Sequence, residues 1–355
     1  MNKYITLILL LVSSSTFAIE NDTAYYHHYQ SLDNNSDFIY VDIKNRIYGY
    51  CTINDEFIPF TGLLTKNNFV LRRRWSEDII FNGTLYDAYI SGQLYTAKST
   101  DNITFYKKPQ HYVLPLHQYS MLEKTKLLEN KKDSPSGKLS ITLILPDKKY
   151  KYYNQITSDI FELILQTEPM KDLTVDGLFE VVKKTFKESY IKQNKSRYEN
   201  NHNYKKACNW IKQKTVDVIY NDENILCMSI NNYAFTGGNH GITISNFINI
   251  DIETGKKIKY NDIFCKEKES SISKLIQQEI RKKYRIEDSQ PLSQQGFFYD
   301  TIKPATNIYF TALGVGFVYN VYQIAPYSYG TIEVFLPIAC IRESMNKEIL
   351  KKYNL

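Results

Sequence analysis

The chain has 355 residues, of which 43% are hydrophobic and 23% are charged. These fractions are close to globular averages and exclude a wholly disordered chain, a collagen and a coiled coil. The formal net charge of +6 is small for this length and excludes the concentrated basic groove that nucleic acid requires, so we expect no nucleic-acid partner. The length predicts two domains.

The N-terminus has the features of a Sec signal peptide. An apolar run, YITLILLLV, spans residues 4–12 and is followed by Thr16 and Ala18, small residues placed as signal peptidase requires. We therefore predict a signal peptide over residues 1–18 and a periplasmic or secreted protein. The run is shorter than the about 20 residues that cross a bilayer. No membrane span is expected after cleavage.

Short β-like runs separated by turns fill residues 37–108. Four times a large apolar residue stands two positions before a glycine, at Ile47, Phe60, Phe81 and Ile90. Glycines within strands mark bends where a small sheet curls on itself. We predict a small all-β domain over residues 19–121, either a curved meander or a barrel-like sheet.

Charge and turn residues then interrupt the pattern. Arg72, Arg73 and Arg74 form a tight basic cluster, which we interpret as solvated charge along a strand edge. Residues 122–137, LEKTKLLENKKDSPSG, lose the alternation and gather Lys, Asp, Ser, Pro and Gly. This composition is typical of a boundary, and we predict a linker there.

The region 138–355 mixes helical and strand patterns without βαβ regularity, which predicts an α+β domain. Apolar spacing predicts helices over residues 154–166, 175–192, with Thr174 as N-cap, and 270–283. Period-two runs predict strands at 139–146, a hairpin turning at 221–224, further strands turning at 254–255, and alternation over 307–337. A last short helix is expected over 338–350.

Motifs of common enzymes are absent from the sequence. No HxxxH or HxH zinc pair, GxSxG elbow, P-loop or GxGxxG occurs. We therefore predict no catalytic residues, no metal site and no cofactor. The cysteines have no CxxC spacing, and export permits one or two disulfides while leaving at least one thiol unpaired. The pairing stays open among Cys51, Cys208, Cys227, Cys265 and Cys340.

Two segments stand out as candidate binding loops. The first, FTGGNHG at residues 235–241, has a glycine pair whose bared amides could meet an acceptor, although such a pair also makes a simple turn. The second, YQIAPYSYG at residues 322–330, contains Pro326, which stiffens the backbone and presents tyrosines. Ordinary sheet packing is the alternative. Of these tyrosines, we expect Tyr322 in the core and Tyr327 exposed.

The ordered set of these loops, the D-x-x-T-G-K turn of residues 251–256 and the paired helices resembles the RsiV-like extracytoplasmic domain family. That domain is shared by a lysozyme-binding anti-sigma factor and a peptidoglycan deacetylase. The resemblance covers roughly residues 138–350, and the N-terminal part more loosely resembles a β-rich region that precedes such domains. It implies an α+β domain that binds a protein partner.

Carried over residue by residue, the resemblance assigns partner binding to Gly237, Gly238, Asn239, His240, Pro326 and Tyr327. Asn239 replaces the alanine of the family's common GGAH. The metal-binding motifs of the deacetylase are absent, so deacetylation is not carried over. Sigma-factor control is not carried over either, because only three residues precede the apolar run.

These observations favour a non-enzymatic exported protein that binds lysozyme or another muralytic enzyme, as an inhibitor or immunity factor. One alternative is a peptidoglycan- or glycan-binding module that uses tyrosines as stacking surfaces. Another is a cell-wall hydrolase that uses His240 with a distant carboxylate. The first hypothesis requires the two loops to project side by side from one end of the protein.

Overall fold

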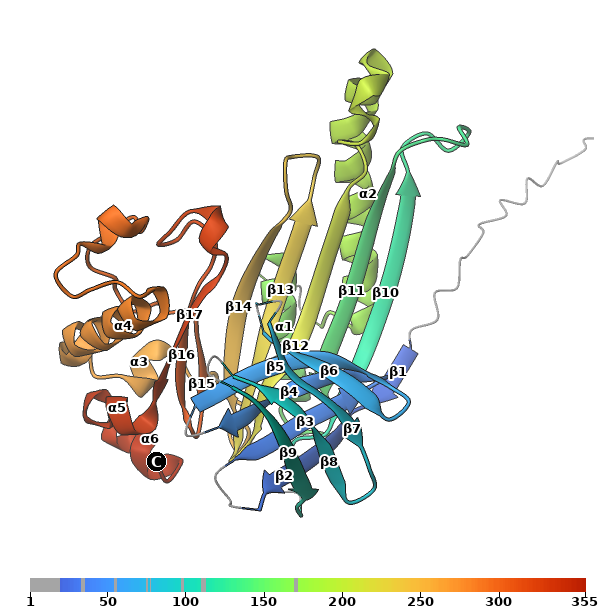
Figure 1. Cartoon of the computed structure of the whole chain (residues 1–355). Helices are drawn as coiled ribbons and strands as arrows, with labels where there is room; N and C mark the ends of the chain where they lie inside the picture. The colour runs from blue at the N-terminus through green and yellow to red at the C-terminus, as the bar shows by residue number, and fades with distance from the viewer. Residues whose placement is uncertain are drawn as a thin grey trace, which may run out of the picture.

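The computed structural model describes residues 20–355 except 33–35, 54–55, 75, 77, 97–98, 110–112 and 169–171. The predicted signal peptide lies outside the described residues. The fold is mixed α+β, as predicted. Figure 1 shows a β-barrel beside the lower half of a tall six-stranded sheet, with a C-terminal unit of short helices and a smaller sheet next to them.

The barrel is closed by eight strands and confirms the barrel-like alternative. Its interior is aromatic, with the Phe38 ring 4.9 Å from that of Phe60 and 5.4 Å from that of Phe105. A Cβ at Gly49 would lie 2.1 Å from a backbone oxygen of the neighbouring strand, so glycine lets the small barrel close. The strands are β2 (Tyr25–Ser31), β3 (Asp37–Ile43), β4 (Arg46–Ile53), β5 (Glu56–Thr65), β6 (Asn68–Arg73), β7 (Ile79–Leu85), β8 (Tyr89–Tyr95) and β9 (Thr100–Lys107).

The six-stranded sheet has the order β1-β10-β11-β12-β13-β14, and only the β11–β12 pair is parallel. Its strands are β1 (Glu20–Thr23), β10 (Leu116–Lys126), β11 (Ser136–Pro146), β12 (Ile211–Asp222), β13 (Ile225–Phe235) and β14 (Ile242–Asp251). Residues 122–137, predicted as a linker, belong to this sheet. They form the end of β10, the turn and the start of β11, and Leu122 pairs with Ser140 across the hairpin.

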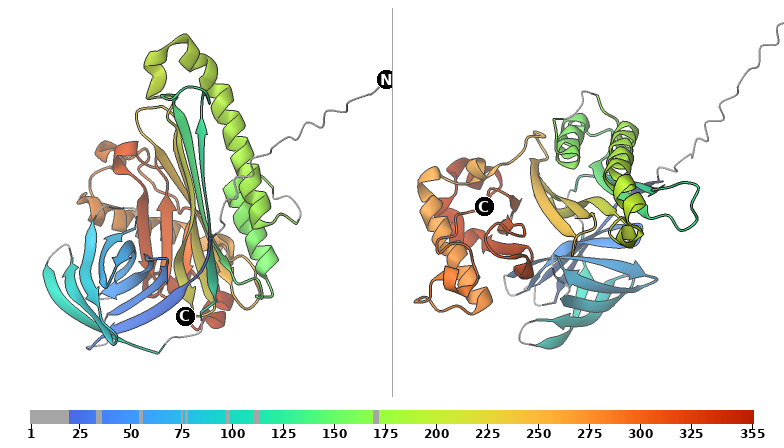
Figure 2. Two further views of the ribbon diagram at one scale, coloured as in Figure 1. Left: turned by 90° about the vertical axis from the view of Figure 1, so that its right-hand side faces the viewer. Right: turned by 90° about the horizontal axis from the view of Figure 1, so that it is seen from above.

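Helices α1 (Tyr153–Leu165) and α2 (Val175–Asn200) connect β11 to β12 and cover one face of this sheet, as the side and top views show (Figure 2). The Thr174 side chain accepts a hydrogen bond from the Gly177 amide at 3.1 Å, which confirms the predicted N-cap. Helix α2 runs eight residues past the predicted end at Lys192, because Asn194 and Tyr198 continue its buried face, and the Asn194 amide is satisfied by the Tyr190 oxygen at 2.8 Å. The 3-10 turn η1 (His202–Lys205) follows.

The C-terminal unit packs helix α4 (Glu269–Tyr284) against a three-stranded antiparallel sheet. The predicted helix over 338–350 is broken into two short helices by an intervening 3-10 turn. The other elements are α3 (Tyr260–Ile263), β15 (Ile308–Thr311), β16 (Gly314–Tyr319), β17 (Ile332–Pro337), α5 (Ile338–Ile341), α6 (Lys347–Lys352), and the turns η2 (Lys266–Lys268), η3 (Leu292–Gln295), η4 (Tyr327–Tyr329) and η5 (Arg342–Ser344).

The D-x-x-T-G-K turn after β14 has a structural role. The Asp251 carboxylate accepts hydrogen bonds from the amide and hydroxyl of Thr254, at 2.8 and 2.9 Å, and from the Tyr353 hydroxyl. It also forms an ion pair with Lys352. This turn therefore fastens the C-terminal helix α6 to the large sheet.

All five cysteines are free, and three of them, Cys51, Cys208 and Cys227, are buried in the hydrophobic cores. The disulfides that export would permit are therefore not formed. In the described part of the chain, every helix is too short or too polar to span a membrane.

Candidate binding surface

The first candidate loop connects β13 to β14. Gly237 has a φ of +90°, and a Cβ there would lie 2.1 Å from the backbone oxygen of Ala207. Position 237 therefore requires glycine for two reasons: its backbone is left-handed, and it lies too close to Ala207 to leave room for a side chain. Gly238, Asn239 and His240 are exposed, and a Cβ at Gly238 would meet nothing closer than 4.0 Å.

The second candidate loop runs from β16 to β17. Tyr329 packs inward, with its ring 5.3 Å from that of Phe297 and its hydroxyl bonded to the Gln295 oxygen at 2.6 Å. Tyr322 has a φ of +66° and is 51% exposed, whereas Tyr327 and Pro326 are half-buried. The predicted placement of Tyr322 in the core is therefore wrong, because its left-handed backbone turns the side chain outward.

The two loops touch. The His240 and Tyr327 rings are stacked, with centroids 3.8 Å apart, and the Tyr327 hydroxyl donates a hydrogen bond of 2.7 Å to the Gly241 oxygen. The Tyr322 ring lies 5.9 Å beyond that of Tyr327. On the other side, Gly241 lies against the Tyr233 ring of β13. The loops thus form one aromatic cluster, which we call the loop cluster: Tyr233, His240, Tyr322 and Tyr327.

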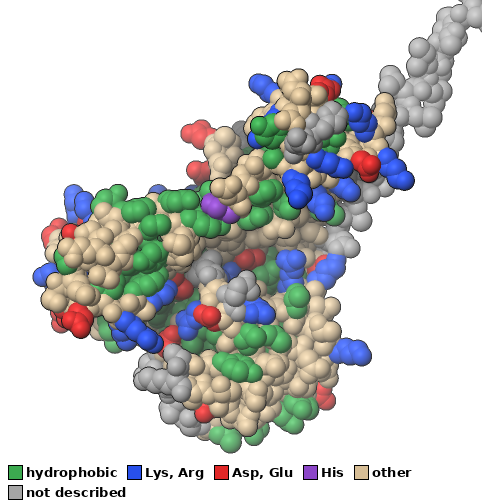
Figure 3. Space-filling model, turned by 45° about the horizontal axis from the view of Figure 1, so that its top comes forward, with side chains coloured by type: hydrophobic (Ala, Val, Ile, Leu, Met, Phe, Trp, Pro, Cys, Tyr) green, Lys and Arg blue, Asp and Glu red, His purple; other side chains and the backbone are tan. Residues whose placement is uncertain are grey.

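The loop cluster borders a sheet face that is only half covered. Figure 3 shows a hollow between the barrel and the upper part of the molecule. In the upper half of β12 and β13, Gln213 pairs with Tyr233 and Ile211 with Phe235, on the face opposite α1 and α2. Ile211 and Gln213 are exposed, and the two aromatic residues are half-buried. We call this half the open face.

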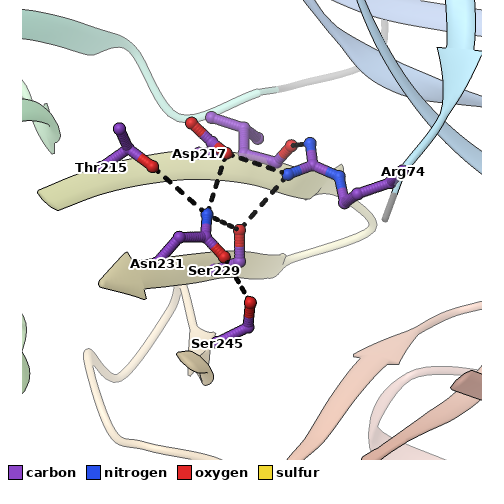
Figure 4. A network of polar contacts seen from close by, with 7 residues as sticks. Arg74, Thr215, Asp217, Ser229, Asn231 and Ser245 are labelled. Carbon is purple, nitrogen blue, oxygen red and sulfur yellow. Dashed lines mark hydrogen bonds and ion pairs between the residues drawn. The ribbon is translucent and has the colours of Figure 1, made fainter. Parts of the chain in front are cut away.

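The lower half of the same face is covered, and its polar residues form a network with the barrel (Figure 4). Arg74 is only 5% exposed, and its guanidinium donates to the Asp217 carboxylate at 3.2 Å, the Ser229 hydroxyl at 3.3 Å and the Val218 oxygen at 3.0 Å. Burial raises the pKa of Asp217, while the nearby Arg74 charge opposes that effect. The interpretation of Arg74 as solvated edge charge is therefore wrong.

The network continues to the C-terminal unit. Asn231 donates to Asp217 at 3.0 Å and accepts from the Ser245 hydroxyl at 2.7 Å. Asn320, just after β16, then bonds both the amide and the carbonyl of Ser245, at 2.8 and 3.0 Å. The side-chain amide of Asn320 thus takes the place of a partner strand at the edge of β14. It fixes the second loop relative to the first.

The described residues contain no group of three or more His, Cys, Asp or Glu side chains placed to hold a metal ion. The His240 ring is exposed, and its Nδ1 lies 3.3 Å from the Gly241 oxygen. A cavity of about 350 Å³ lies at the other end of β14, with Asn249, Lys257 and Tyr260 in its lining.

Two protein-family models match separate regions of the chain, and each region contains one of the two candidate loops. Residues 122–243 match a family model described as deacetylase PdaC, and residues 261–339 match one described as a protein of unknown function, DUF3298. The first loop therefore lies within one matched region and the second loop within the other. Comparison with curated proteins gives no match.

Two solved structures are similar to this chain. A DUF3298 family member from Bacteroides fragilis is 21% identical, with a TM-score of 0.61 over 68% of this chain and 97% of that chain. A DUF3298 family protein from Pseudomonas aeruginosa is 16% identical, with a TM-score of 0.48 over 66% and 96%. The first likeness shows a shared fold. The DUF3298 and PdaC matches are compatible with the resemblance to RsiV-like domains. The assignment to the RsiV-like family itself stays a prediction.

Proposed function

We propose that this chain is an exported, non-enzymatic binding protein that holds a cell-wall hydrolase, such as lysozyme, on the loop cluster and the open face. The matches to PdaC and DUF3298 support a cell-wall-related extracytoplasmic role. Under this proposal the protein blocks the hydrolase, as an inhibitor or an immunity factor.

The observation that carries the proposal is the contact between the two loops. The His240–Tyr327 stack and the Tyr327 hydrogen bond hold side chains from two distant segments in one fixed arrangement. Tyrosines that are already rigid lose little entropy when a partner covers them, and such residues dominate protein interfaces. Tyr322, half exposed at the rim, is the side chain that a partner would bury.

The surroundings of His240 support binding over catalysis. His240 contacts the Tyr327 ring and the Gly241 backbone oxygen, and no carboxylate among the described residues hydrogen-bonds to it. A general base usually needs a neighbour that orients it and tunes its pKa. Stacking on Tyr327 instead fixes the ring as part of a surface.

Titration calorimetry of the mature protein with lysozyme and a panel of muralytic hydrolases tests the proposal. We expect a complex with one of them at micromolar concentration or below, and loss of about 2 kcal/mol or more of binding free energy in Tyr322→Ala and Tyr327→Ala. Tyr25→Ala is the matched control, because Tyr25 is 64% exposed but lies in the barrel. Absence of any complex across the panel would contradict the proposal.

A further inference from the structure

The barrel has two dissimilar sides. Strands β4 and β5 turn their outer side chains toward the rest of the protein: the Tyr50 ring lies 5.4 Å from that of Tyr220, and the Phe57 ring 4.8 Å from that of Phe335. The outer side chains of β7, β8 and β9 have no such cover, and most are exposed or half-buried. The outward side of β7, β8 and β9 is therefore open to solvent, and we call it the outer barrel face.

Three tyrosines form one end of the outer barrel face. Tyr89 and Tyr106 are paired across β8 and β9, with ring centroids 6.1 Å apart, and Tyr86 is stacked on Tyr89 at 4.4 Å. Tyr86 is 45% exposed and Tyr106 is 39% exposed. The three rings form one continuous aromatic surface, which suits a ligand with a flat apolar face.

Amide side chains form the next part of the face. Asn82, Gln93 and Asn102 stand opposite one another on three adjacent strands, and all three are exposed. Each amide has two donors and an acceptor, and the Gln93 oxygen already accepts a hydrogen bond of 2.9 Å from the Tyr95 hydroxyl. Gln93 lies four residues from Tyr89 along β8, which corresponds to about 13 Å. The face is thus long enough for a chain of more than one ring.

Hydroxyl groups lie between the tyrosines and the amides. Ser91 and Thr104 are paired by a hydrogen bond of 2.9 Å, and Thr84 donates to Asn68 at 2.8 Å. The outward strand positions from the tyrosines to the amides are uncharged, and the exposed carboxylate of Asp87 lies beside the tyrosines in the turn between β7 and β8. Figure 3 likewise shows mainly uncharged atoms on the lower part of the barrel that faces the viewer.

We propose that the outer barrel face binds a neutral glycan chain. The flat apolar face of a pyranose ring would stack on Tyr86 and Tyr106, and its hydroxyl or acetamido groups would exchange hydrogen bonds with Asn82, Gln93 and Asn102. The lack of charge disfavours an anionic polymer or a lipid headgroup, which needs cations. The face lies on a different part of the molecule from the loop cluster, so this inference is independent of the proposed function.

Affinity electrophoresis of the folded protein in native gels tests this inference. The gels contain glycol chitin or hydroxyethyl cellulose, which are neutral, or carboxymethyl cellulose, which is anionic. We expect a neutral polymer to retard the protein, with little dependence on salt. Tyr106→Ala should weaken retardation about tenfold, equivalent to ~1.4 kcal/mol. Tyr106→Phe, which keeps the ring, should stay near the wild-type value.

Control variants test whether the effect is specific to the outer barrel face. Tyr322→Ala, in the loop cluster, should leave retardation unchanged, and thermal unfolding should show that both Tyr106 variants stay folded. Failure of both neutral polymers to retard the protein would overturn the inference, as would retardation by the anionic polymer alone. A wild-type dimer that Tyr106→Ala converts to monomers in sedimentation would show instead that a second copy occupies the face.

Discussion

The lower and upper halves of the large sheet carry the same strands but different side chains on the barrel-facing side. In the lower half, Asp217 pairs with Ser229 and both bind Arg74 of the barrel. In the upper half, four residues along β12, Gln213 pairs with Tyr233 and is exposed. One face of the sheet thus has two roles: its lower half packs against the barrel, and its upper half is open to a partner. The polar network around Arg74 lies at the covered end.

The largest expected effect comes from the covered half. Arg74→Ala leaves Asp217 buried without its cation, and we expect the free energy of unfolding to fall by about 3–5 kcal/mol. The control is Arg73→Ala, which removes an exposed ion pair with Glu56 at 3.1 Å and should cost about 1 kcal/mol or less. Chemical denaturation measures both. Equal effects would show that the network does not hold the barrel to the sheet.

The next largest effect is expected in the first loop, beside the open face. Gly237→Ala forces a side chain into a left-handed backbone and against Ala207, and should cost about 1–3 kcal/mol. Gly238→Ala meets open space and should stay within about 0.5 kcal/mol. Thermal or chemical unfolding distinguishes them. A neutral Gly237→Ala would mean that the loop is not seated on Ala207.

A pH effect is expected where β14 meets α6. Burial by itself raises the pKa of Asp251, but hydrogen bonds from Lys352, Tyr353 and Thr254 outweigh it and hold the pKa below its usual value. A carboxylate with a lowered folded pKa stabilises the fold above its unfolded pKa, and that stability is lost as the pH falls through the folded pKa.

Asp251→Asn should therefore lower the free energy of unfolding at pH 7 by about 1–3 kcal/mol. It should also reduce the loss of stability as the pH falls below about 4, because the titrating group is gone. Asp288→Asn, at an exposed position after α4, is the control. Denaturation series at several pH values give the answer, and an unchanged acid slope in Asp251→Asn would contradict the assignment.

The smallest effect concerns the bond between the two loops. Tyr327→Phe keeps the stack on His240 but removes the hydroxyl that bonds Gly241, and should cost about 1 kcal/mol. Tyr322→Phe at the exposed rim should have no measurable effect on stability. Hydrogen exchange at loop amides would reveal the loosening directly; matching exchange rates in the two variants would show that the hydroxyl does not join the loops.

Local patterns in the sequence predicted local structure well. The glycines placed after Ile47 and Phe60 predicted a curled small barrel, and Thr174 predicted the start of α2, because these signals act within a few residues. The position of residues 122–137 was missed, since turn composition looks alike in a linker and in a hairpin within a sheet. Disulfides were permitted by export, but Cys51, Cys208 and Cys227 serve as core side chains.

Long-range partners could not be predicted in the same way. Arg74 meets Asp217, 143 residues later, and nothing in the RRR run distinguishes its third member from the exposed first. The glycine pair predicts either exposed amides or a simple turn, whereas the contact of Gly237 with Ala207 comes from another segment. Tyr322 was misplaced because a left-handed residue interrupts the alternation on which the expectation rested.

The barrel begins and ends at one place on the large sheet. Thr23 of β1 pairs with His117 of β10, and the Ala24 amide bonds the Leu116 oxygen at 3.1 Å, so the chain leaves the sheet and returns to it between adjacent strands. The eight-stranded barrel is thus an inserted domain between β1 and β10. A short connection from Thr23 to Leu116 would remove it, and a different module could be grafted there without changing the path of the remaining strands.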